Sequence, residues 1–289
     1  MHLANLDNEV FFKKVFTDPD VFRAFVKDIT GVDIVDAKIE TEKQLEHKVA
    51  AINFKLDIYA ESPDKRIVIE IQRVDYDYSF DRFMHYFLAL LVDLQRNSKD
   101  YSFQQDVYTI VVLTSPYVVK EKTGQLIKDD VLISDLNPRT LTNKIREIYP
   151  HKLIFLNPNY TSPDTPAPIQ DWLEFILTSI KNPANPTYNH ANAAIAKAAT
   201  LADIENMPES VLEDAKIAEA RSKTTKIYAS IEHGKGVEEG LKFGKEKEKK
   251  ETVIKLYKKG KTAAEISDLL DIELEIVEQI ILDFEQSQQ

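Results

Sequence analysis

The sequence contains no cysteine and only 7 glycines among its 289 residues. The missing cysteines exclude disulfides, thiolate zinc sites and a cysteine nucleophile, so any metal must be held by oxygen ligands or by the 6 histidines. No glycine-rich phosphate loop is present. We therefore expect no nucleotide cofactor, and a metabolic enzyme is disfavoured.

Long hydrophobic runs are also absent. No apolar stretch reaches the roughly 18 residues that a membrane-spanning helix needs, and the start MHLANLDNEVFFKK lacks the basic and apolar regions of a signal peptide. We expect a cytoplasmic protein with no membrane partner. The net charge of -11 argues against a protein that coats nucleic acid by charge alone. It does not exclude a nuclease, because clustered carboxylates can hold a cation.

The remaining composition is typical of a folded protein, with 43% apolar and 29% charged residues. Helical and alternating patterns follow one another along the chain, which predicts an α/β fold. Helices are predicted between Glu9 and Thr30 with a break near Pro19, from Tyr76 to Asn97, and from Ile169 to Ile180. Strands are predicted at Ile34–Glu42, Lys48–Glu61, Arg66–Arg73, Val107–Thr114 and Leu153–Leu156. The nearly continuous apolar run VYTIVVLT indicates a strand buried on both faces.

Helical patterns dominate the chain from about Asn189 onward, after a proline-rich loop at residues 157–168. We expect a main domain at 1–185, a helical extension at 186–250 and a small module at 251–289. In this module Thr262 and Glu265 form a capping box that starts a helix. A turn at Asp271 then leads to a second helix, Glu273–Phe284, and the pair resembles a helix-turn-helix.

The second helix of this module carries several acids and no Lys or Arg, so it would repel phosphates. We therefore favour packing or a homodimer through the C-terminal helices over DNA reading. The preceding stretch, Lys245–Lys261, has eight lysines against three glutamates and is the better candidate for phosphate contacts. The alternative for this stretch is a solvated helix face with i,i+4 ion pairs.

The two strands around Ser62–Lys65 form a predicted β-hairpin. If the turn is centred between Pro63 and Asp64, paired residue numbers sum to 127, so Asp57 faces Glu70 and Lys55 faces Gln72. Alternation places these four polar residues on one face. The other face is apolar and consists of Phe54, Leu56, Ile58, Ile67, Ile69 and Ile71.

Asp57 and Glu70 would repel each other as directly opposed carboxylates. A bound cation would reverse this repulsion, and Mg²⁺ or Mn²⁺ fits such oxygen ligands. Such a metal can activate a water towards a phosphodiester. The alternative is an ordinary half-exposed hairpin with a solvated polar face.

A resemblance to a known family favours the metal site. KLDIYAES followed by VIEIQ resembles the D(x)nExQ signature of the PD-(D/E)XK nuclease family transposases, also called Rpn recombination-promoting nucleases. NEVFFKKVF at 8–16 is similar to the opening NDxxFKxxF of that family, with Glu9 in place of Asp. Arg82 and Tyr86 resemble its RxxYY segment, and DVYTIVVL is similar to its next core strand.

The resemblance implies a restriction-endonuclease-like core, with a mixed β-sheet flanked by helices and an all-α C-terminal extension. It implies a metal-dependent DNA endonuclease, linked to recombination or mobile elements, with Mg²⁺ or Mn²⁺ as cofactor and DNA as partner. Asp57 and Glu70 would be metal ligands, and Glu9 the helix-borne acid that joins them. Gln72 would stand where many relatives have the catalytic lysine.

Gln72 cannot supply the charge of a lysine, so a second metal or a neighbouring cation must help. Lys55 is a candidate, and the alternative is a surface lysine. Arg82 and Tyr86 are separated by four residues on one helix, so both could bind substrate in the same cleft, although Tyr86 could equally be core packing. The rival to the enzyme is a catalytically inactive nucleic-acid-binding or regulatory protein that keeps this fold.

Overall fold

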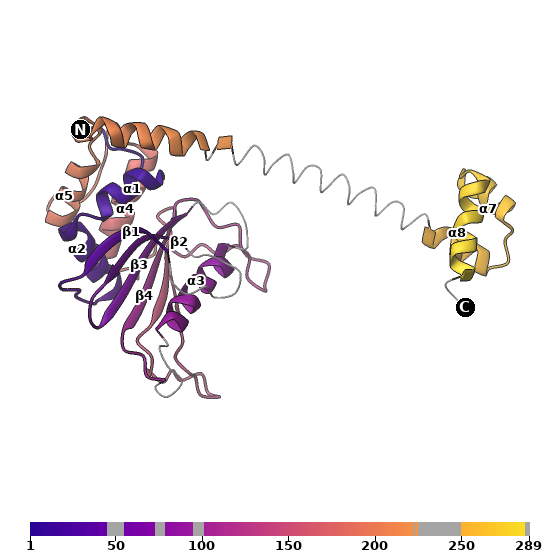
Figure 1. Cartoon of the computed structure of the whole chain (residues 1–289), viewed down its shortest axis with the longest axis horizontal. Helices are drawn as coiled ribbons and strands as arrows, with labels where there is room; N and C mark the ends of the chain where they lie inside the picture. The colour runs from indigo at the N-terminus through magenta and orange to yellow at the C-terminus, as the bar shows by residue number, and fades with distance from the viewer. Residues whose placement is uncertain (45–54, 73–78, 95–100, 222, 225–249, 287–289) are drawn as a thin grey trace. The chain divides into compact units, whose positions relative to one another are not determined.

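The computed structural model describes residues 1–44, 55–72, 79–94, 101–221, 223–224 and 250–286. Two compact units make up the chain, Met1–Glu219 and Ala220–Gln289 (Figure 1). The sequence placed its boundaries near residues 185 and 250 instead. Helix α5 (Ala193–Ala202) packs into the same core as the N-terminal helices, so it is part of the first unit.

A mixed six-stranded sheet forms the centre of the first unit, with the strand order β1-β2-β3-β4-β6-β5. The strands are β1 (Lys38–Gln44), β2 (Lys55–Glu61), β3 (Lys65–Gln72), β4 (Asp106–Leu113), β5 (Val131–Asp135) and β6 (Lys152–Leu156). β3, β4 and β6 are parallel to one another, whereas β1, β2 and β5 join by antiparallel pairs. The predicted α/β fold with a mixed sheet is confirmed.

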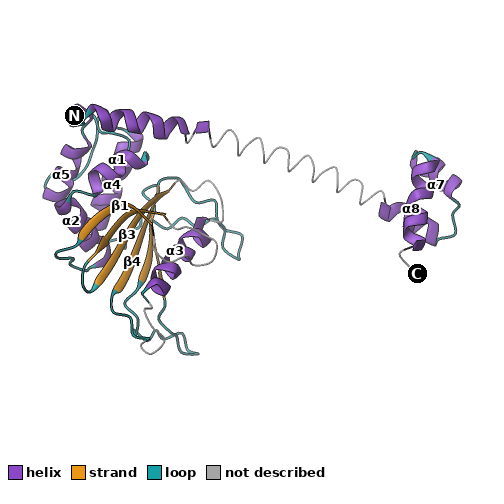
Figure 2. Cartoon of the chain, viewed as in Figure 1, coloured by secondary structure: helices purple, strands orange, loops and turns teal. Residues whose placement is uncertain are grey.

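Helices cover both faces of this sheet (Figures 1 and 2). Helices α1 (Glu9–Phe16), α2 (Pro19–Thr30), α4 (Ala167–Lys181) and α5 lie on one face. The aromatic rings of Phe16, Phe25 and Trp172 meet in the core beneath them. Helix α3 (Ser79–Asp93) covers the other face, where Phe83 and Phe87 pack against β4 and β6. β4 contributes to both cores, as predicted.

The N-terminal helices begin at side-chain caps. Asn8 accepts a hydrogen bond from the backbone N–H of Val10 at the start of α1. Asp18 caps α2 in the same way, and Pro19 stands at its first position. This confirms the predicted break near Pro19. The caps fix the direction of α1, which carries Glu9 and Lys13 towards the hairpin.

The other predicted elements agree with the structure apart from their ends. β1 begins at Lys38 rather than Ile34, and the short strand β5 was not predicted. Residues 45–54, which include Phe54 and the predicted start of the second strand, lie outside the described residues, as do 73–78 and 95–97 at the predicted strand and helix ends. The short 3-10 helix η1 (Ile204–Asn206) and a helical segment at 209–221 follow α5.

The second unit is a small helical cluster. Helical residues 250–258, α7 (Ala263–Leu270) and α8 (Leu274–Gln286) share a core of Val253, Ile266, Val277, Ile280 and Ile281. The capping box of Thr262 and Glu265 is present as predicted. Residues 245–249 of the lysine-rich stretch are outside the described residues. Within the described ranges, no helix has the length and apolar character needed to cross a membrane.

Candidate active site

Asp57 and Glu70 lie where the β2–β3 ladder ends within the described residues. The paired residues run from Glu61 and Arg66 to Ile58 and Ile69, and their numbers sum to 127 as predicted. At the next position, that of Asp57 and Glu70, side-chain carboxylates accept the hydrogen bonds between the two strands. Glu70 Oε1 accepts a hydrogen bond from the backbone N–H of Asp57 at 2.9 Å, and Asp57 Oδ2 accepts one from that of Ile71 at 3.2 Å. Each carboxylate is thereby fixed to the backbone of the opposite strand.

The side-chain alternation of β2 is broken at Asp57. Ile58 belongs to the core beneath α1 and α2, whereas Leu56 belongs to the core beneath α3. The prediction that Leu56 shares a face with Ile58 is therefore wrong. On β1, Glu42 stands between the two residues that pair with Leu56 and Ile58, and its φ is 55°. This left-handed conformation marks a local distortion beside Asp57.

The hairpin face that carries Glu70 becomes apolar towards the turn, where Tyr59 and Val68 are buried beneath α3. Polar side chains gather at the hairpin end that carries Asp57. Glu70 is only 2% exposed, so the solvated-face interpretation does not apply to it. Burial raises the pKa of the Glu70 carboxyl well above its usual 4.5, and the negative charge of Asp57 raises it further.

Lys13 of α1 contacts this carboxylate pair. Its Nζ lies 3.1 Å from Asp57 Oδ1, 3.3 Å from Glu9 Oε2 and 3.4 Å from Glu42 Oε1, and its side chain is 13% exposed. Burial alone would lower the pKa of Lys13, but the charges of Asp57 and Glu9 outweigh it and the pKa is raised. Sequence reasoning missed this residue, although it stands at the lysine position of the motif NDxxFKxxF.

Among the residues that the structure describes, Glu9 contacts the site only through Lys13. It has a 54% exposed side chain and an i,i+4 ion pair with this lysine. In the described part of the chain, no three acidic or histidine side chains are grouped so that they could hold a metal. Lys55 pairs with Glu42 at 2.8 Å and is 55% exposed. Its predicted position opposite Gln72 lies beyond the described ladder.

Gln72 is contacted from α3. Arg82 Nη1 donates a hydrogen bond to Gln72 Oε1 at 3.0 Å, and its Nε donates one to the Tyr86 hydroxyl at 3.0 Å. Tyr86 also packs against the core beneath α3, so its ring contributes to packing while its hydroxyl contacts Arg82. The backbone carbonyl of Gln72 accepts from Thr114 N at 3.1 Å, and the hydroxyl of Thr114 donates to Asp7 Oδ1 at 2.5 Å.

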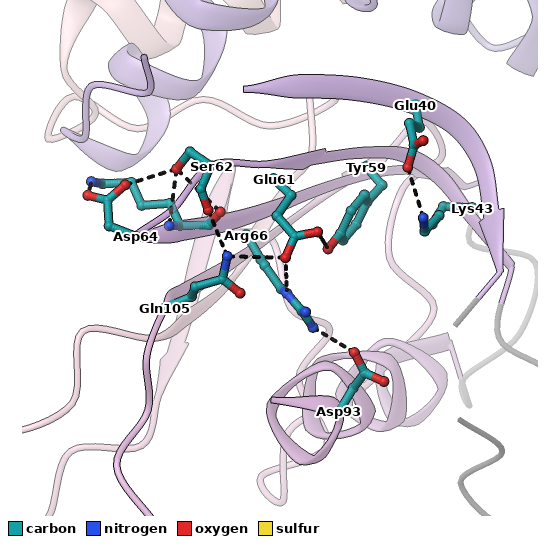
Figure 3. Close-up of polar contacts among 10 residues, drawn as sticks. Glu40, Lys43, Tyr59, Glu61, Ser62, Asp64, Arg66, Asp93 and Gln105 are labelled. Carbon is teal, nitrogen blue, oxygen red and sulfur yellow. Dashed lines mark hydrogen bonds and ion pairs between the residues drawn. The ribbon is translucent and has the colours of Figure 1, made fainter. Parts of the chain in front are cut away.

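The opposite end of the hairpin is fixed by a buried arginine (Figure 3). Arg66 Nε donates to Glu61 Oε1 at 3.1 Å, and its Nη1 donates to Asp93 Oδ2 of α3 at 2.7 Å. Gln105 donates to the same Glu61 oxygen at 3.1 Å and to the carbonyl of Ser62 at 2.7 Å. These bonds hold the hairpin against α3, which carries Arg82 and Tyr86 at the site.

The residues at the site fit a hard divalent cation. Asp57 and Glu70 offer only oxygen donors, which Mg²⁺ and Mn²⁺ prefer. A buried carboxylate beside a second carboxylate is unfavourable until a cation offsets the charge. Glu70 uses only Oε1 in its hydrogen bond within the described residues, so its second oxygen can serve as a ligand. Glu9 is not part of this pair.

Comparison with known families gives a match to the PD-(D/E)XK nuclease family transposases over residues 7–231. The match covers α1, the hairpin, α3, the rest of the sheet and the helices up to the end of the first unit. It confirms the resemblance seen in the motif residues. Searches of curated proteins and of solved structures gave no match.

Proposed function

The chain belongs to the PD-(D/E)XK nuclease family transposases, and we propose that it is a metal-dependent DNA endonuclease in which Asp57 and Glu70 carry the reaction. One observation supports this assignment most strongly. The two acids exchange backbone hydrogen bonds where the strand ladder ends, and Glu70 is buried with a raised pKa. A raised pKa combined with a specific charged neighbour is typical of functional sites.

In this proposal Asp57 and Glu70 hold Mg²⁺ or Mn²⁺. The ion, when bound, lowers the pKa of a coordinated water and offsets negative charge on the phosphate. The side chains need little rearrangement, because the backbone N–H groups of Asp57 and Ile71 already orient both carboxylates. The raised pKa favours a proton on Glu70 when no cation is present, and Glu70 loses that proton on binding.

Arg82 and Tyr86 form the proposed substrate contacts. Arg82 is exposed and lies beside Gln72, so its guanidinium can bind a DNA phosphate next to the acids. Its bond to Tyr86 holds it over the site. Gln72 has its amide oriented by Arg82, which suits a positioning role. Glu9 assists through its ion pair with Lys13 rather than as a direct partner of Glu70.

DNA is the proposed substrate, because the family is one of nuclease transposases. A role in recombination or in mobile elements follows from the same description. The C-terminal helices are a proposed homodimer surface, since α8 exposes Leu274, Ile276 and Leu282. Measuring the mass of the purified protein by light scattering, with and without the charged variant Leu282→Glu, tests this part separately.

Cleavage of supercoiled plasmid tests the proposed activity. The parent protein should nick or linearise the plasmid with Mg²⁺ or Mn²⁺ and not with EDTA, and Asp57→Ala should leave the plasmid intact. Plasmid that stays intact with every metal would instead favour the catalytically inactive binding or regulatory protein. Cleavage that is equal in Asp57→Ala would contradict the assigned site.

A further inference from the structure

The third position of the D(x)nExQ motif carries no charge. Gln72 is an amide, whereas hydrolysis of a phosphodiester builds negative charge that a nearby cation can stabilise. The structure describes three cationic side chains around the site, Lys13, Lys55 and Arg82. Their contacts differ, and this difference indicates which of the three stands beside the carboxylate pair.

Lys55 is bound to Glu42 and is more than half exposed. Arg82 is bound to Gln72 and Tyr86 on the α3 side. Among the residues that the structure describes, only Lys13 forms an ion pair with a member of the carboxylate pair, at 3.1 Å from Asp57 Oδ1. It is also the least exposed of the lysines at the site.

We infer that Lys13, carried on α1, supplies to the active site the positive charge that Gln72 lacks. The inference rests on the proposed nuclease function. Three carboxylates from three elements surround the ammonium, Glu9 on α1, Glu42 on β1 and Asp57 on β2. An ammonium has three donors, so each carboxylate can take one of them. The three carboxylates therefore hold the positive charge of Lys13 beside Asp57, although β3 has no lysine at position 72.

The helix that carries Lys13 is packed against the core. Its helix neighbours Phe12, Val15 and Phe16 are fully buried, and the rings of Phe12 and Phe16 stack at 4.2 Å. The neighbouring Lys14 is exposed and points away from this core. The two lysines thus differ in environment while they share the helix, which makes Lys14 a matched control.

A purely structural role for Lys13 would be to hold Asp57 in place for the metal. The two roles differ in their consequences. If Lys13 supplies charge, a lysine introduced at position 72 should replace it, and its removal should not weaken metal binding, because an ammonium repels a cation. If Lys13 only holds Asp57, its removal should weaken metal binding and a lysine at 72 should not help.

The experiment compares the full-length parent with Lys13→Met, Lys14→Met, Gln72→Lys and the double variant Lys13→Met/Gln72→Lys. Rates of Mg²⁺-dependent plasmid cleavage are measured at saturating DNA, and Mn²⁺ affinity is measured by water proton relaxation.

We expect Lys13→Met to lower the rate about 100-fold, the size of effect seen when one charge-stabilising group is removed. Lys14→Met should keep the parent rate. The double variant should cleave about tenfold faster than Lys13→Met or more. It should bind Mn²⁺ as tightly as the parent or more tightly.

Three results would overturn the inference. Parent-like cleavage by Lys13→Met would do so while leaving the nuclease function intact. Loss of both cleavage and Mn²⁺ affinity in Lys13→Met, without rescue by Gln72→Lys, would assign the structural role instead. A parent protein that cleaves no DNA would overturn the proposed function and this inference with it.

Discussion

The backbone N–H of Asp57 donates to Glu70 Oε1 at 2.9 Å, at the position where the β2–β3 ladder would otherwise continue. A carboxylate thus takes the place of a backbone carbonyl. The reciprocal bond from Ile71 N to Asp57 Oδ2 completes the exchange. Both acids therefore connect the two strands in addition to their proposed role in binding a metal ion, and substitutions must be chosen to separate the two.

Asp57→Asn tests the charge of Asp57 while keeping its shape. The amide oxygen can still accept from Ile71 N, so we expect the melting temperature to stay close to that of the parent. Loss of the negative charge weakens the binding of a divalent cation, because a neutral amide oxygen is a poorer ligand than a carboxylate, and cleavage should fall about 100-fold or more. Plasmid assays and thermal unfolding measure the two effects. Asp33→Asn, an exposed acid paired with Lys27, is the charge-matched control and should cleave like the parent.

Glu70→Gln should stabilise the protein near neutral pH. The pKa of Glu70 is raised in the folded state, so the folded protein binds more protons than the unfolded one above pH 4.5. The free energy of unfolding then falls as pH rises from there towards the folded-state pKa. Replacing the acid should remove this loss, so the free energy of unfolding of Glu70→Gln should depend less on pH in this range. Urea unfolding at several pH values measures it, and an unchanged pH dependence in Glu70→Gln would contradict the assignment.

Divalent cations should stabilise the parent and not the Glu70→Gln protein. Binding to the folded state alone adds about 2.7 kcal/mol at a hundredfold excess over the dissociation constant. Melting curves with Mn²⁺ or with EDTA measure this gain. An equal gain in both proteins would place the bound ion elsewhere in the chain.

Arg82→Met should weaken DNA binding and make it less salt-dependent. Loss of one phosphate contact lowers the slope of log affinity against log salt by about 0.9. Fluorescence anisotropy with a DNA duplex, in the Asp57→Asn background to prevent cleavage, measures the slope. Tyr86→Phe keeps the ring and removes the hydrogen bond to Arg82, so a smaller change is expected. A slope equal to that of the parent would exclude Arg82 as a phosphate contact.

Arg66→Met should strongly destabilise the hairpin end opposite the site. Arg66 has a 4% exposed side chain and its guanidinium bonds to Asp93, which is also largely buried. Removing one partner of a buried pair costs about 3–5 kcal/mol. The double variant Arg66→Met/Asp93→Leu should recover part of this loss in chemical unfolding. Lys27→Met breaks an exposed, solvent-screened pair and should change the stability far less than Arg66→Met does.

The hairpin shows how far local pattern predicts structure. Its turn residues and alternating pattern gave the correct register, and with it the proximity of Asp57 and Glu70. The break in alternation at Leu56 depends on packing against two different cores and leaves no local signal. Lys13 stands at the lysine position of a family motif, but its contact with Asp57 joins a helix to a strand far along the chain and cannot be predicted from a local pattern.

The sheet edge shows the same limit. β5 spans five residues, VLISD, with partly exposed side chains, so neither its length nor its burial produces a clear strand pattern. Its place is set by pairing with β6, a relation between segments that no local window contains. The regular apolar spacing of α1, α2 and α4 allowed these helices to be predicted close to their observed ends.

The central claim is that Asp57 and Glu70 share one divalent cation, and Mn²⁺ in crystals of the protein tests it most directly. Anomalous difference maps should show one peak within about 2.0–2.3 Å of an oxygen of each carboxylate, and the peak should vanish in Asp57→Asn. A peak that contacts neither acid, or no peak at Mn²⁺ concentrations that support cleavage, would contradict the account.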